Sequence, residues 1–410
     1  MIVYPSEDKH YYALKSYRYV IFILYLLTAL LIVKTVQFSG LEQGSDPRPL
    51  VEFDAFYIVG QMVWRGEIEQ AYHFVTMAQA QIAFSGSQSF MPWTYPPQFD
   101  LLVASLALLP LGVAYGLFTA GTLVTYLATL RQIAGESFAA VLLVLFPAIV
   151  IMIACGQNGF LTATLIGLTC LGLQRGRALA GLPLGLMIIK PHLAIAFAVY
   201  TLVTRRWSTA FVAFATVSTT SALATVLLGP EVWLAFLGGM REARIFLEKG
   251  YYPLFRMISP YAALHSFGFP AMVAIATQVL VAALSLSVVC LAVYRRLELR
   301  QSLGLTAIAS LLISPYAYDY DLPIYGIGFA LLLPDLVRLG SELERKALYG
   351  LSFFTGIFGL AQHFQLQGQS GSDAMIGENM PLSVAGLTLT ALLGLTWRIL
   401  GRDYESRANS

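Results

Sequence analysis

Apolar residues occur in long blocks along the chain, separated by short polar segments. Many blocks have about 17–25 residues, the length that an α-helix needs to cross about 30 Å of hydrocarbon. The blocks cover residues 19–37, 99–131, 137–155, 158–174, 178–204, 208–228, 270–294, 302–314, 321–338, 347–364 and 382–400. The pattern predicts an all-α polytopic membrane protein with about 11–13 crossings.

Two blocks are expected to be interrupted. Block 99–131 is too long for one helix and contains Leu109-Pro110-Leu111-Gly112. Block 178–204 contains Lys190-Pro191-His192 and must cross twice if the arginine pairs on both its flanks lie on one side of the membrane. Proline removes a backbone donor and breaks or kinks a helix, so both blocks should divide at these positions.

The segment 38–98 is the largest one outside the apolar blocks. Apolar residues within 55–64 and 71–84 recur with helical spacing, which is typical of short amphipathic helices on a bilayer surface. We therefore expect a single integral membrane domain over residues 1–410. Its parts are a first membrane helix at 19–37, an outer loop at 38–98 and a multi-helix bundle at 99–400.

Composition supports lipid as the solvent. Hydrophobic residues make up 57% of the 410 residues and charged residues 12%, whereas soluble domains have about 25% charged residues. The net charge is +2 and no basic stripe is present, which argues against nucleic acid as a partner. Metal-ligand spacings and glycine-rich phosphate loops are absent from the sequence, so neither a metal nor another cofactor is expected.

The distribution of arginine and lysine predicts the orientation. Basic residues concentrate in alternate loops, which marks those loops as cytoplasmic. They are Arg175, Arg177, Arg205, Arg206, Arg295, Arg296, Arg300, Arg338, Arg345, Lys346, Arg398 and Arg402. The other loops, including 38–98, 229–269 and 314–321, are then extracytoplasmic.

Candidate functional residues lie on this outer side. Asp54 in Phe53-Asp54-Ala55-Phe56-Tyr57 is either a general base or the N-cap of a helix at 55–64, and Tyr57 beside it is a candidate for substrate binding. Tyr95 precedes two prolines, where it can bind substrate or anchor the interface. Gln157 and Asn158 in Gly156-Gln157-Asn158-Gly159 can bind sugar hydroxyls or satisfy a tight turn.

Charged residues suggest sites for an anion and for a sugar. Lys190, followed by His192, lies in an apolar block, so it either snorkels to the interface or awaits an anion such as a lipid-linked phosphate. Arg256 places a positive charge in an outer loop, against the usual bias. Asp319 and Asp321 lie among tyrosines, which suits carbohydrate binding but also fits helix caps within an interfacial aromatic belt.

Taken in order, these motifs resemble bacterial glycosyltransferase family 87. The resemblance is carried by FDAFYIVGQMVWRGE, AYHF, TYPPQFDLLVASLALLPLGVAY, GQNGFLTATLIGLTCLGLQRGRALAGLPLGLMIIKPHLAI and SPYAYDYD, over most of residues 50–325. It implies the C-type glycosyltransferase fold and transfer of a sugar, typically mannose, from a polyprenyl-phosphate donor on the outer face of the bacterial cytoplasmic membrane. One departure is that a histidine often found after the SP element is replaced here by Asp319-Tyr320-Asp321.

The resemblance also implies a mechanism. Asp54 matches the proposed catalytic base of the family and would deprotonate the hydroxyl of a lipid or glycan acceptor. Lys190 and Arg256 would offset the charge that develops on the departing lipid phosphate. A secondary transporter or flippase of lipid-linked sugars is the main alternative, because it would use the same intramembrane charges. A non-catalytic assembly subunit is a third reading, in which Asp54 is dispensable.

Overall fold

The computed structural model describes the backbone of residues 6–40, 48, 50–367 and 381–408, and the side chains of residues 18–40, 48, 50–362 and 381–402. Within this part of the chain the secondary structure is helical, with no strands and one isolated antiparallel bridge. The predicted all-α class is confirmed.

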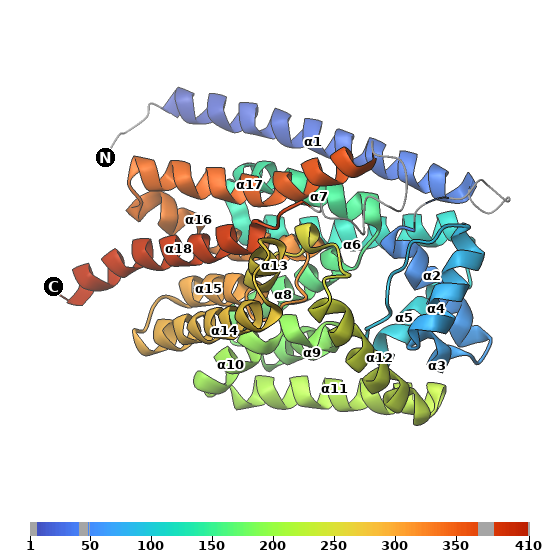
Figure 1. Ribbon diagram of the computed structural model, residues 1–410. Helices are drawn as coiled ribbons and strands as arrows, with labels where there is room; N and C mark the ends of the chain where they lie inside the picture. Colours follow the sequence, from blue (N-terminus) through green and yellow to red (C-terminus); the bar gives the residue numbers. More distant parts are fainter. Residues whose placement is uncertain (1–5, 41–47, 49, 368–380, 409–410) are drawn as a thin grey trace.

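Twelve of the described α-helices lie side by side in a bundle, with the start of α1 and the end of α18 at one end (Figure 1). The bundle consists of α1 (Ser6–Gly40), α6 (Leu111–Ala134), α7 (Phe138–Cys155), α8 (Gly159–Gln174), α9 (Gly181–Leu186), α10 (Ile195–Val203), α11 (Trp207–Leu228), α14 (Ala271–Tyr294), α15 (Leu299–Leu311), α16 (Leu322–Leu339), α17 (Glu342–Gln367) and α18 (Ala385–Ala408). The other α-helices are α2 (Glu52–Trp64), α3 (Ile68–Ala71), α4 (Phe74–Ser85), α5 (Pro97–Leu106), α12 (Glu231–Glu248) and α13 (Pro260–Ser266). Of these, α2 to α5 gather at the opposite end of the bundle from the start of α1.

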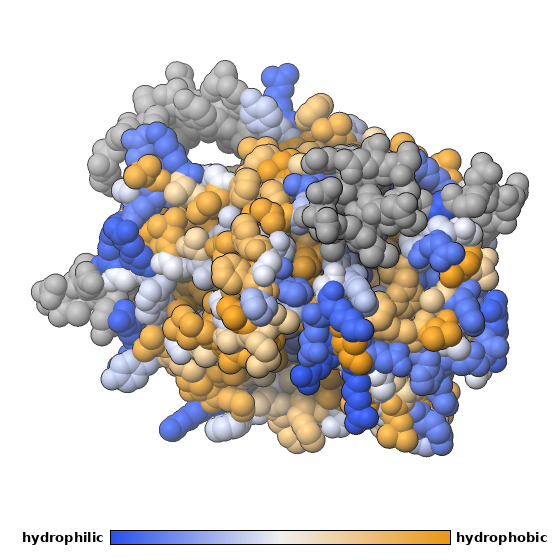
Figure 2. Space-filling model, viewed as in Figure 1, coloured by the Kyte–Doolittle hydropathy of each residue, from blue (hydrophilic) through white to orange (hydrophobic). Residues whose placement is uncertain are grey.

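Several helices have the length and the apolar surface of membrane-spanning helices. Among the described residues, five helical stretches are long and apolar enough to cross a membrane, namely Arg18–Gly40, Leu111–Cys155, Trp207–Leu228, Ala271–Tyr294 and Asp319–Leu339. In the most apolar window of α11 only 6% of the residues are buried by protein, against 78% in the Asp319–Leu339 stretch. So much exposed apolar surface would be unfavourable in water. On the face shown in Figure 2, apolar residues cover much of the surface, and hydrophilic residues gather toward both ends and in one group below the centre.

The two interruptions predicted from proline are confirmed. Helix α5 ends at Leu106 and α6 begins at Leu111, directly after Pro110. The second break separates α9 from α10, with short 3₁₀ turns at Met187–Ile189 and Pro191–Leu193 on either side of Lys190. The second break places the charged residue Lys190 within the bundle. The total of about 11–13 crossings stays a prediction.

The described part of the 38–98 loop contains the helices expected there, with shifted bounds. The helix predicted at 55–64 begins earlier and forms α2, and the one predicted at 71–84 corresponds to α4, with the short helix α3 ending at Ala71 before it. Most residues of α2 are buried, so this helix packs inside the protein instead of lying on the bilayer with one face exposed. Gly60 allows this packing, because a Cβ there would lie 2.3 Å from the Val103 carbonyl oxygen of α5.

Candidate active site

Arg256 lies between two carboxylates from distant parts of the chain. Its guanidinium donates to both oxygens of Asp319, at 3.1 and 3.0 Å, and to Oε1 of Glu52. Burial lowers the pKa of Arg256, but the carboxylates of Asp319 and Glu52 raise it above its usual value. The guanidinium therefore remains charged inside the protein.

A short backbone pairing brings Arg256 to Asp319. Met257 and Tyr318 form an isolated antiparallel bridge, and the Ile258 N–H donates to the Ala317 carbonyl at 2.8 Å. The 229–269 loop is thereby fixed against the SPYAYDYD segment. Two regions that were separate candidates in the sequence become one site.

Lys190 forms a second buried ion pair beside this one. Its Nζ donates to Oδ1 of Asp321 at 2.7 Å, and the two side chains are 7% and 1% exposed. The other carboxylate oxygen of Asp321 accepts from the Tyr318 N–H at 3.1 Å. Lys190 is therefore paired with Asp321 inside the protein, and its ammonium does not extend to an interface.

The ring of Tyr320 joins the two ion pairs. Nζ of Lys190 lies 4.5 Å from the ring centroid and Cζ of Arg256 lies 5.6 Å from it, within the range of cation–π attraction. A Cβ on Gly159 would lie 1.8 Å from the Tyr320 carbonyl oxygen, so only glycine fits where α8 begins. We call Glu52, Lys190, Arg256, Asp319 and Asp321 the ion-pair cluster.

The GQNG turn between α7 and α8 packs against this region. Gly156 has φ +63°, and a Cβ there would lie 2.8 Å from Cβ of Phe53, so the turn requires glycine. Gln157 Oε1 accepts from the Tyr95 hydroxyl and from the Asn158 N–H, both at 2.8 Å. Burial raises the pKa of Tyr95 well above its usual value, with a smaller contribution from Asp321, so Tyr95 stays a neutral donor.

Asn158 is the polar residue of the turn with unused hydrogen-bonding capacity. Its side chain is fully buried, and neither Oδ1 nor Nδ2 has a hydrogen-bond partner among the described residues. The amide lies near the Tyr95 hydroxyl but outside hydrogen-bond geometry. Buried amides without partners are unfavourable. The turn therefore uses Gln157 for its own structure and leaves Asn158 available to a ligand.

Two other candidates have different surroundings. His192 lies close enough to Lys190 and Asp321 for their charges to act on its ring, and its Nε2 is buried without a hydrogen-bond partner within the described structure. Tyr57 donates from its hydroxyl to the Leu109 carbonyl at 3.0 Å, where α2 meets the connection between α5 and α6. His192 thus borders the ion-pair cluster, whereas the hydroxyl of Tyr57 is used in packing.

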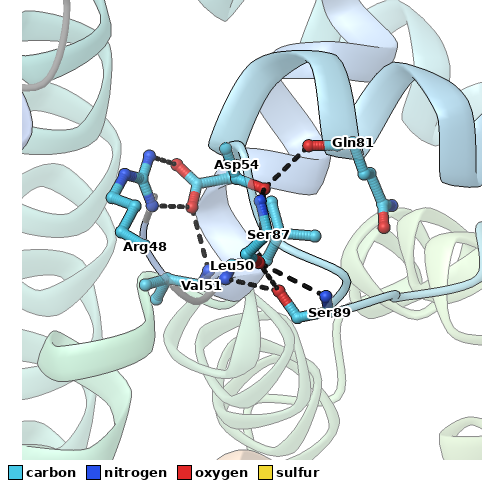
Figure 3. Close-up of polar contacts among 8 residues, drawn as sticks. Arg48, Leu50, Val51, Asp54, Gln81, Ser87 and Ser89 are labelled. Carbon is cyan, nitrogen blue, oxygen red and sulfur yellow. Dashed lines mark hydrogen bonds and ion pairs between the residues drawn. The ribbon is translucent and has the colours of Figure 1, made fainter. Parts of the chain in front are cut away.

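Asp54 is held by three hydrogen bonds at the start of α2 (Figure 3). Arg48 binds it with both ends of the guanidinium, at 2.6 and 2.8 Å, and the Val51 N–H donates to Oδ2 at 2.9 Å. Asp54 is fully buried. The helix begins at Glu52, so Asp54 lies in its first turn and binds the N–H of the preceding N-cap residue. The predicted capping role is present in this altered form.

A cavity of about 440 Å³ adjoins the Asp54 ion pair. It is lined by Lys34, Gln37, Phe38 and Gly40 of α1, by Arg48 and Val51, and by Ala154 of α7. Arg48 and Val51 are the residues that bind the Asp54 carboxylate. The cavity therefore reaches the immediate partners of the candidate base.

Sequence reasoning missed two residues of this site. Glu52 precedes Asp54 by two positions, and as an acidic residue among aromatic ones it could have been considered together with Asp54. Arg48 lies in an irregular segment, where no periodicity indicates its direction. In the described parts of the chain, no group of three or more His, Cys, Asp or Glu side chains is arranged to hold a metal ion.

Comparison with known proteins gives one match. The family model described as glycosyltransferase family 87 matches residues 93–315, a little more than half of the 410 residues. This range includes Lys190 and Arg256 but ends before Asp319, and it begins after Asp54. No curated protein and no solved structure matches the chain. The chain therefore belongs to glycosyltransferase family 87 and is a membrane glycosyltransferase.

Proposed function

We propose that the enzyme transfers a sugar, mannose, from a polyprenyl-phosphate donor to a lipid or glycan acceptor by a single inverting displacement. The observation that carries this proposal is the convergence of two cations on the ring of Tyr320, the buried Lys190 and Arg256, whose side chain is 12% exposed. Cations held away from water interact strongly with a phosphate group. A departing polyprenyl phosphate needs such stabilisation, because it gains negative charge as the glycosidic bond breaks.

The carboxylates of the ion-pair cluster keep these cations in place before the donor binds. Lys190 is paired with Asp321, and Arg256 is paired with both Asp319 and Glu52. A donor phosphate would share the two cations with these carboxylates or replace one of them. The carboxylate oxygens so released can accept hydrogen bonds from sugar hydroxyls, which is the substrate-binding role that we assign to Asp319 and Asp321.

The remaining residues bind the acceptor and remove its proton. Asp54 acts as the general base, accepting the proton of the attacking hydroxyl while that oxygen forms the bond to the anomeric carbon. The unused amide of Asn158 binds a substrate hydroxyl, and Tyr95, Gln157 and His192 surround the same region. Because polyprenyl phosphate is a good leaving group, the reaction does not require a general acid.

A secondary transporter or flippase of lipid-linked sugars is the alternative. The buried Lys190–Asp321 pair favours it, because intramembrane ion pairs commonly mark ion or substrate pathways. In that case the donor lipid would cross the bilayer intact, and no carboxylate would act as a base.

Labelling of single cysteines tests the proposed extracytoplasmic position of the site. With Cys155, Cys170 and Cys290 replaced, an impermeant thiol reagent applied to whole cells should label Gln70→Cys and not Ser208→Cys. Both positions are exposed. They lie on the outer loop and beside the basic pair that the positive-inside rule places in the cytoplasm.

Permeabilised cells are the control, because both positions should then be labelled. Labelling of Ser208→Cys and not Gln70→Cys in whole cells would reverse the orientation and refute an extracytoplasmic site. Other arginines that the positive-inside rule counts as cytoplasmic have carboxylate partners in the structure. Arg300 and Arg338 bind Asp335, while Arg402 binds Glu344 through two hydrogen bonds of 2.7 Å.

A further inference from the structure

Two cations line the cavity next to the Asp54 ion pair. Lys34 lies toward the outer end of the apolar helix α1 and is half-buried, and it makes no hydrogen bond or ion pair with any described residue. Arg48 lines the same cavity, together with the apolar residues Phe38, Val51 and Ala154. A positive charge within a membrane helix is unfavourable unless it meets a partner or reaches water. The cavity thus combines two cations with an apolar wall.

We propose that Lys34 and Arg48 form a binding site for the phosphodiester of an anionic membrane glycerophospholipid. A phosphate carries negative charge and several oxygens that accept hydrogen bonds, so it can bind an ammonium and a guanidinium at the same time. The apolar wall and the position between α1 and α7 favour a ligand with acyl chains. Neither Lys190 nor Arg256 lines this cavity, so the site goes beyond the anion site of the proposed function.

Binding at this site is coupled to Asp54 through Arg48. The guanidinium gives two hydrogen bonds to the Asp54 carboxylate, and a lipid phosphate in the cavity competes for the same positive charge. The lipid weakens the hold of Arg48 on Asp54, and the Asp54 charge weakens lipid binding by the same free energy, because coupling between sites is reciprocal. An anionic lipid therefore loosens the carboxylate that we propose as the base.

A lipid-binding measurement tests the site without relying on sugar transfer. Purified full-length protein in nanodiscs of phosphatidylcholine is titrated with a fluorescent phosphatidylglycerol, and with the matching phosphatidylcholine probe as reference. Wild type should prefer phosphatidylglycerol. Lys34→Gln should lose about fivefold of that preference, the contribution expected of one basic residue near anionic lipid. Asp54→Asn should bind phosphatidylglycerol more tightly, because the Asp54 carboxylate no longer competes for Arg48.

The control is Lys249→Gln, which removes an exposed lysine from an outer segment that does not line the cavity. It should bind like wild type. An unchanged preference in Lys34→Gln, or none in wild type, would overturn the site. Unchanged binding in Asp54→Asn would overturn the coupling through Arg48. Lys34-dependent binding of undecaprenyl phosphate, without such dependence for phosphatidylglycerol, would assign the cavity to the donor lipid and refute the proposal.

Discussion

Asp54→Asn is expected to slow sugar transfer by about 10²–10⁴-fold, the usual contribution of a positioned general base. Asn keeps an oxygen that can accept from the Val51 N–H, so the start of α2 stays capped. It removes the basic carboxylate and also the charge that Arg48 binds. The variant should therefore lose thermal stability as well, since removing one member of a buried ion pair is destabilising. Initial transfer rates and thermal unfolding should both be measured.

Two variants of Arg48 separate the chemical role from the structural one. Arg48→Gln breaks the same ion pair but keeps the carboxylate, so its transfer rate should fall less than that of Asp54→Asn. Combining Arg48→Gln with Asp54→Asn removes both charges, which should recover stability without recovering transfer. Near wild-type transfer by the double variant would show that Asp54 is only a structural residue.

Lys190→Met is expected to weaken donor binding by about 10–100-fold, because a hydrogen bond to a charged group contributes about 1.5–3 kcal/mol. The sequence alone suggests that this variant stays folded, since Met keeps the apolar stem. The structure changes this expectation. Without the ammonium, the fully buried Asp321 loses its counter-charge, and removing one partner of a buried pair destabilises a protein by about 3–5 kcal/mol.

The matched test neutralises both partners. Lys190→Met combined with Asp321→Asn leaves no unpaired buried charge, so the protein should be nearly as stable as wild type while donor binding stays weak. Asp321→Asn alone keeps the ammonium, so it should lose less donor affinity than Lys190→Met, although it removes a carboxylate that we assign to sugar binding. The dissociation constant of polyprenyl-phosphate mannose is measured for each variant. Wild-type affinity in the double variant would restrict Lys190 to a structural role.

Local sequence signals predicted the breaks of the bundle but not its packing. Pro110 and Pro191 act on their own backbone, so the interruptions beside them could be read directly. Helix α2 is buried against α5, and Gly60 of α2 lies next to the Val103 carbonyl of α5. Nothing in the periodicity of 55–64 indicates that second surface. The residue spacing gave a helix but could not distinguish a bilayer surface from a protein interior.

In the candidate site, too, the sequence indicates which residues are unusual but not which residues they bind. Lys190 was recognisable as an unusual charge, yet its partner Asp321 lies 131 positions away, and no spacing rule connects them. The structure also shows that Asp54 is bound by Arg48, which the sequence did not suggest. Glu52 likewise pairs with Arg256, 204 positions away, which no local pattern indicates.

The most direct test of the proposed function is the fate of the donor. Purified protein in proteoliposomes is incubated with polyprenyl-phosphate mannose and total membrane lipids, and the lipid products are separated and quantified. We predict the release of free polyprenyl phosphate in a one-to-one ratio with a new mannosylated product, and formation of both products about 10²–10⁴-fold more slowly with Asp54→Asn. Donor that remains chemically intact, or that only moves from one leaflet to the other, would contradict the assignment and favour a transporter.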